Sequence, residues 1–204
     1  IVDDSTGFHV HHGVMNEGIT ATQLLNIAAF YSKFQTTINQ LVDASRRNNR
    51  MCAQWTVQQV QEAKEYFNRH PFDSAVNAAS SLGQNRYKTV NFAAGLQHGT
   101  VEFRQKEGTL DADVVASWIV FTQLIVTYSI KANEANQKWA SQGTNTHRGG
   151  SEIHAKALSA AKEADGLRWI ATYLSKFGSW QGLEKAAWAT LLAQGCNTNE
   201  RMVS

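Results

Sequence analysis

The chain has 204 residues, which is enough for one domain or at most two and for a substantial buried core. Hydrophobic residues make up 43% and charged residues 18% of the sequence, a globular composition that excludes a disordered or fibrous protein. The formal net charge of +2 is too small to indicate a nucleic-acid-binding protein.

The first predicted element is a strand over residues 7–13, which carries three of the seven histidines. Side chains alternate between the two faces of a strand, so His9 and His11 face one way while Val10 and His12 face the other. Two imidazoles on one face form a ligand pair that needs a third partner. The strand is therefore the first candidate for a metal or catalytic site.

A long amphipathic helix is predicted next, from a capping box at Thr20–Gln23 to about Arg46. It ends in the run 45–50, which holds three arginines. Cations are favourable at a helix C-terminus, and this is the simpler interpretation of the run. The alternative is an anion site, because Arg46 and Arg47 present planar donor pairs that fit phosphate or carboxylate.

After a helix from the capping box at 56–59 to about residue 68 and a short helix over 72–82, the hydrophobic period changes from helical to alternating. Residues 87–92 and 100–105 are predicted to form an antiparallel hairpin around a loop at 95–99. Glu102 and Arg104 then share one face of the second strand. The hairpin brings two earlier polar residues near that strand, Arg86 and Asn91.

The rest of the chain is predicted to be helical apart from one polar loop. A long helix follows residue 108 and completes a core over residues 1–132, residues 133–150 form a polar loop that is more simply a linker than a lid, and residues 151–204 form a helical C-terminal region. The whole pattern predicts an α+β fold in which long helices cover a small antiparallel sheet.

The two cysteines are too few for a disulfide framework and lack metal-ligand spacing, which favours a reducing compartment and a packing role for each. No run approaches the roughly 18 apolar residues of a membrane span, and the N-terminus lacks a signal-peptide pattern. We therefore expect a cytoplasmic protein that binds neither membrane nor nucleic acid. Since the chain begins at Ile1 without a methionine, we also expect that residues precede it.

The chemistry of His9, His11 and Glu102 is compatible with two kinds of metal. Zn²⁺ accepts imidazole and carboxylate ligands in hydrolases, whereas Mg²⁺ or Mn²⁺ prefers oxygen and substrate phosphates. The nearby arginines favour the second kind, because phosphoryl transfer needs cations that neutralise the transferred group.

Four segments together resemble the amidoligase family, which is related to glutamine synthetase and glutamate–cysteine ligase. They are residues 7–11, 45–49, 100–104 and 107–111, in the family's order, and the resemblance covers about the first 125 residues. It implies the catalytic half of a glutamine synthetase-like fold. It also implies an ATP-dependent carboxylate–amine ligase that uses Mg²⁺ or Mn²⁺ and acts on a small-molecule or peptide carboxylate and an amine through an acyl phosphate.

The resemblance also implies roles for individual residues. His9 and Glu102 would hold the divalent cation, with His11 beside it or on the substrate side. Arg104 would neutralise the transferred phosphoryl group. Phosphate or the substrate carboxylate would be contacted by the run at the end of the long helix, Arg46, Arg47 and Asn48.

One departure from the family pattern is expected to matter. Related ligases carry a Glu-x-Glu pair on strands that precede the histidine strand, and here only Asp3 and Asp4 occupy that place. The chain is therefore expected to be part of a larger ligase, to complete its site with another chain, or to lack activity. A non-enzymatic structural or interaction subunit, for example in a viral or phage assembly, and a zinc hydrolase built on His9 and His11 are the alternatives.

Overall fold

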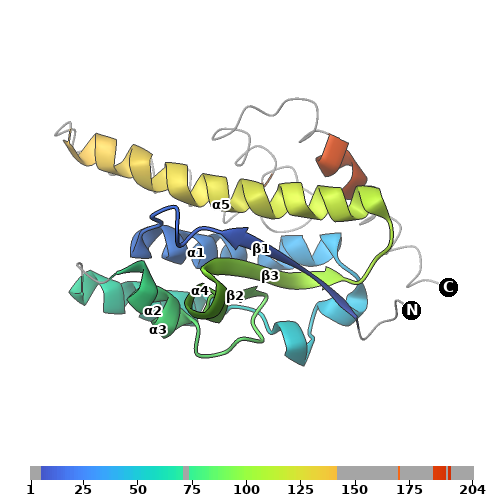
Figure 1. Cartoon of the computed structure of the whole chain (residues 1–204), viewed down its shortest axis with the longest axis horizontal. Coiled ribbons are helices and arrows are strands. Elements are labelled where there is room, and N and C mark those ends of the chain that lie inside the picture. The colour runs from blue at the N-terminus through green and yellow to red at the C-terminus, as the bar shows by residue number, and fades with distance from the viewer. Residues whose placement is uncertain (1–5, 71–73, 142–169, 171–185, 192, 194–204) are drawn as a thin grey trace.

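A computed structural model of the chain describes residues 6–70, 74–141, 170, 186–191 and 193 (Figure 1). Residues 142–150 of the loop predicted over 133–150, and most of the predicted C-terminal helices, lie outside these residues. The described part is a mixed α+β structure, and this confirms the predicted fold class in its coarse form.

Three antiparallel strands form the sheet, in the order β1-β3-β2: β1 (Gly7–Gly13), β2 (Val90–Asn91) and β3 (Thr100–Glu107). The histidine strand pairs with the strand of Glu102, with His11 opposite Glu102, and so brings together the residues grouped from the sequence. This pairing joins segments that lie about 90 residues apart in the sequence.

The predicted hairpin is only partly present. β2 has two residues, and the expected loop contains the short helix α4 (Ala93–His98). The side chain of Asn91 accepts a hydrogen bond from the Ala93 N–H and so satisfies a donor at the start of the helix. Gly99 ends it with a positive φ of 68°, which a glycine adopts without strain.

The β1–β3 ladder contains a β-bulge. Phe8 pairs with Lys106 and Val10 pairs with Phe103. A single residue of β1, His9, therefore faces two residues of β3, Arg104 and Gln105. The extra residue is on β3, which fits the bulge geometry in which two residues oppose one.

The first long helix, α1 (Ala21–Ile38), begins at the predicted capping box but ends before the predicted Arg46. Val42 is extended, and the N–H of Asp43 donates to the Glu107 carboxylate, so the chain leaves the helix to reach the end of β3. The arginine run is therefore not a helix C-terminus. A 3₁₀ turn, Asn39–Leu41, follows α1, and the run spans two more, Ala44–Arg46 and Arg50–Cys52.

Three further helices follow, α2 (Val57–Arg69), α3 (Ala75–Leu82) and α5 (Ala112–Ser141). α5 runs past the boundary predicted at residue 133. By length and composition, Ala112–Lys131 could cross a membrane, with a mean hydropathy of 1.5, which corrects the prediction that no such stretch exists. Half of its most apolar part is buried inside the fold, as in the core helix of a globular domain.

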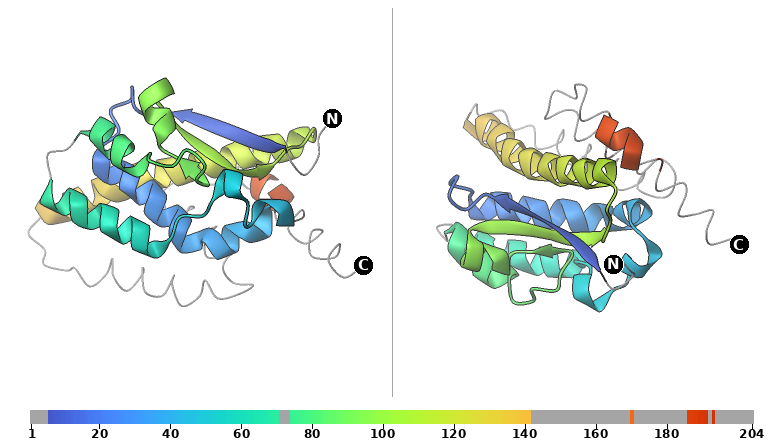
Figure 2. Two further views of the ribbon diagram at one scale, coloured as in Figure 1. Left: turned by 90° about the horizontal axis from the view of Figure 1, so that it is seen from below. Right: turned by 45° about the vertical axis from the view of Figure 1, so that its right-hand side comes forward.

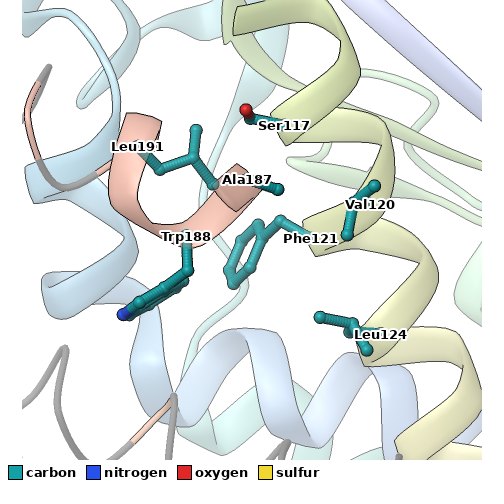
Figure 3. Close-up of a pocket in the computed structure, with 7 residues that line it drawn as sticks. All are labelled: Ser117, Val120, Phe121, Leu124, Ala187, Trp188 and Leu191. Carbon is teal, nitrogen blue, oxygen red and sulfur yellow. The ribbon is translucent and has the colours of Figure 1, made fainter. Parts of the chain in front are cut away.

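The core lies on one side of the sheet, where α1 and α5 pack together (Figure 2). Phe103 of β3 and Tyr31 of α1 are fully buried and their rings lie 5.9 Å apart. The helical residues 186–191 pack on the outer side of α5, where Trp188 faces Phe121 with ring centroids 6.0 Å apart (Figure 3). The opposite face of the sheet carries His9 and His11.

Candidate functional site

The alternation predicted for the histidine strand is confirmed. His9 and His11 are exposed on one face of β1, and Val10 and His12 are buried on the other. His12 forms a hydrogen bond with the Thr122 hydroxyl of α5 at 2.8 Å, and burial lowers its pKa. His12 therefore belongs to the core, which leaves two histidines on the exposed face.

Glu102 is the centre of the cluster on this face. Its Oε1 lies 2.9 Å from His9 Nδ1, 2.8 Å from Arg104 Nη1 and 3.5 Å from His11 Nε2. Its Oε2 accepts a 2.6 Å hydrogen bond from the Asn91 amide. Glu102 and Arg104 are both only 7% exposed at the side chain, whereas His11 is 41% exposed, so the charged pair lies beneath the imidazoles.

These contacts determine the ionisation of Glu102. Burial alone would raise the pKa of its carboxyl. The hydrogen bonds from His9 and Asn91 and the charge of Arg104 outweigh that effect and lower the pKa from 4.5 to about 2. The carboxylate is therefore charged at neutral pH and well below it.

Of the two polar residues predicted to lie near the Glu102 strand, Asn91 contacts Glu102 and Arg86 does not in the described structure. Asn91 is fixed between two partners, since its oxygen accepts from Ala93 N–H and its nitrogen donates to Glu102. Arg86 is exposed, with its guanidinium 5.5 Å from the centre of the Tyr87 ring. Asn91 belongs to the cluster, and no contact between Arg86 and Glu102 is seen in the described residues.

Arg104 is held from several sides by groups that sequence reasoning missed. Its Nε donates to the Met51 carbonyl at 3.4 Å, and its guanidinium lies 5.8 Å from the centre of the Tyr87 ring. Met51 and Tyr87 are each about 40% exposed and border the cluster. Neither has a sequence signal, because a backbone carbonyl and a single tyrosine belong to no motif.

The predicted arginine run is split by the structure. The guanidinium of Arg46 is buried and donates to the carbonyls of Arg104 and Gln105. Arg47 donates to the Val42 carbonyl, five residues earlier. Asn48 is exposed on the turn that follows. Of these three residues, only Arg46 is seen to contact the strand that carries Glu102, and its side chain bonds the backbone carbonyls of that strand.

The cluster does not fit a metal ion as it stands. Among the residues that the structure describes, no group of three or more His, Cys, Asp or Glu side chains is arranged to hold one. His9 touches Glu102 directly, and the Arg104 cation lies against the same oxygen. The donor types suit a divalent cation, but they bond one another instead of surrounding a space, so the predicted metal-binding roles of His9, His11 and Glu102 remain predictions.

A family model described as "Putative amidoligase enzyme" matches residues 1–126. The chain belongs to this amidoligase family. The match spans β1, the arginine run and β3, so every residue of the cluster around Glu102 lies inside it. No curated protein and no solved structure gives a significant match to this chain.

Proposed function

We propose that the chain is an ATP-dependent carboxylate–amine ligase, or the part of one that contains the cluster around Glu102. In this reaction a carboxylate oxygen attacks the γ-phosphorus of ATP and ADP leaves. The amine nitrogen then attacks the acyl carbon, phosphate leaves, and the amine loses a proton. The product is an amide or isopeptide bond. Family membership supports the reaction class.

One observation supports the location of the site above all others. Two motifs about 90 residues apart place His9, His11, Glu102 and Arg104 on one open face of the sheet, in direct contact. A buried charged pair beneath exposed imidazoles is costly to desolvate and is often no more stable than a well-packed apolar pair of similar size. Such an arrangement is typical of a functional site.

The difference in exposure between the imidazoles and the charged pair suggests a role for each residue in the reaction. His9 and His11 are exposed, so a bound substrate meets them first, and an imidazole there can take the proton that the amine loses. Glu102 orients His9 through the Nδ1 contact, and Arg104 supplies positive charge beneath it. Because the described residues do not fit a metal ion, none of these steps is assigned to Mg²⁺ or Mn²⁺.

The direct test supplies the purified chain with Mg-ATP and mixtures of carboxylates and amines and measures ADP release. We expect release that depends on the amine. Arg104→Lys should reduce it by about 100-fold, because lysine keeps the charge but cannot contact Glu102 and the Met51 carbonyl together.

Arg69→Lys is the matched control, because Arg69 is an exposed residue of α2 whose Nε donates only within its own helix in the described structure. It should leave ADP release unchanged. No amine-dependent release from a folded wild-type chain would contradict the proposed function.

A second candidate is a structural or interaction subunit that keeps the ligase fold. The internal bonding of the cluster favours it, since both oxygens of Glu102 already accept hydrogen bonds from protein groups. This candidate predicts no ADP release and no Mg-ATP binding by calorimetry, together with stable association with other chains. Nucleotide binding by a monomer would contradict it.

A further inference from the structure

We propose that Arg46 is a positioning residue that stabilises the β3 bulge, fixes the backbone at Arg104 and thereby keeps Lys106 off the face that carries Glu102 and Arg104, in place of the phosphate contact that the family resemblance implies. The catalytic part of this inference rests on the function proposed above. The structural part concerns only the described residues of β1, β3 and the turn that carries Arg46.

The bulge is what Arg46 contacts. His9 of β1 faces both Arg104 and Gln105 of β3, so the regular ladder is interrupted at these two residues. Nη2 of Arg46 donates to the Arg104 carbonyl at 2.8 Å, and its Nε donates to the Gln105 carbonyl at 3.4 Å. The two residues bonded by one guanidinium are the two that form the bulge. A planar fork of donors is suited to such a pair of acceptors.

The bulge in turn determines which way the side chains of β3 point. Gln105 donates to Asn39 and accepts from Gln35, both at the end of the first helix region, and Lys106 donates to the Leu41 carbonyl in the same region. Two consecutive side chains therefore point inward. Arg104 remains on the opposite face, beside His9. Without the bulge, strict alternation would place Lys106 on the same face as Arg104.

Burial separates Arg46 from any ligand on the exposed face. Its side chain is 2% exposed, and no carboxylate of the described residues lies within ion-pair distance of it. The Arg46 guanidinium instead donates hydrogen bonds to the carbonyl oxygens of Arg104 and Gln105. A substrate phosphate that contacted Arg46 would have to compete with the two carbonyls that its guanidinium already binds, so a direct contact is disfavoured.

Gly7 gives a second, independent sign of this packing. A Cβ at residue 7 would lie 2.6 Å from Arg46 Nη2 and 3.1 Å from His9 Nε2. Both distances are shorter than ordinary contacts, so any side chain there would push the guanidinium away from β3 and also press on His9. The glycine that opens the histidine strand is explained by the close approach of Arg46.

Hydrogen–deuterium exchange tests the proposal without any need for activity. We expect Arg46→Ala to speed exchange in the peptide covering residues 103–107 by about tenfold or more, while exchange in α2 changes little. Arg46→Lys should give a smaller local effect, because a lysine donates from a single atom. Arg50→Ala removes the charge of an exposed arginine in the same run and should leave both regions unchanged.

Gly7→Ala keeps the test decisive if Arg46→Ala does not fold, since it displaces the guanidinium without removing it. We expect the same local increase in exchange over residues 103–107. Unchanged exchange there in folded Gly7→Ala and Arg46→Lys, or an equal increase throughout the protein, would overturn the proposal.

Kinetics separate this inference from the proposed function. If the wild-type chain releases ADP, Arg46→Lys should lower kcat by about tenfold with the KM for Mg-ATP within about twofold. A raised KM with an unchanged kcat would instead show a direct phosphate contact and overturn the proposal. If the wild-type chain releases no ADP, the proposed function fails, and the exchange result still decides the role of Arg46.

Discussion

We expect Glu102→Gln to lower the free energy of unfolding by about 3 kcal/mol, because it removes one member of a buried ion pair and leaves Arg104 without a counter-charge. The new amide also presents an N–H group to a site at which Asn91, His9 and Arg104 all donate. At least one buried donor is then left without an acceptor.

Urea unfolding followed by circular dichroism measures this change. Glu62→Gln is the matched control, because it makes the same chemical change on an exposed helix, where the carboxylate accepts only a bond from the Gln58 side chain in the described structure. The control should change the free energy of unfolding by less than about 0.5 kcal/mol. A loss below about 1 kcal/mol in Glu102→Gln would show that the cluster is not tightly paired.

Acid removes the same stabilisation from the wild-type chain. The pKa of Glu102 is about 2 in the folded chain and 4.5 in the unfolded reference, so the unfolded state binds the proton more readily. The contribution is present in full above about pH 4.5 and is lost as the pH falls towards about 2. The expected loss from this group is about 3 kcal/mol.

The control for the pH dependence is the variant itself. Because Glu102→Gln has no carboxyl at this position, its stability should fall less steeply between pH 4.5 and pH 2 than that of the wild type. Urea midpoints measured at intervals across this range give both slopes. Parallel curves for the two proteins would contradict the lowered pKa of Glu102.

Sequence reasoning succeeded where local rules determine the outcome. The capping boxes at Thr20 and Thr56 begin α1 and α2 as predicted, because each side chain satisfies a free N–H in the first turn. Strand alternation placed His9 and His11 on one face and His12 in the core. The same rule placed Glu102 beside them once the two strands paired.

It failed where a long-range contact overrides the local pattern. Alternation cannot reveal a bulge, since an extra residue in β3 leaves no mark on composition. The sequence of the run around Arg46 predicts a helix end or an anion site, but the Arg46 guanidinium donates to carbonyls of a strand about 60 residues later. The loop predicted over 95–99 is mostly α4, because a helix of six residues carries too little periodic signal.

The burial of β3 on both sides of the bulge determines how this strand tolerates substitution. From Val101 to Lys106, six consecutive residues of β3 are buried, and four of them are polar or charged. Tolerance to substitution should therefore not alternate along this strand, as it does in most half-buried strands. A saturation scan would find a continuous intolerant block, and only Glu102 and Arg104 within it contact the candidate site through their side chains. Invariance along β3 is thus a poor guide to which residues take part in catalysis.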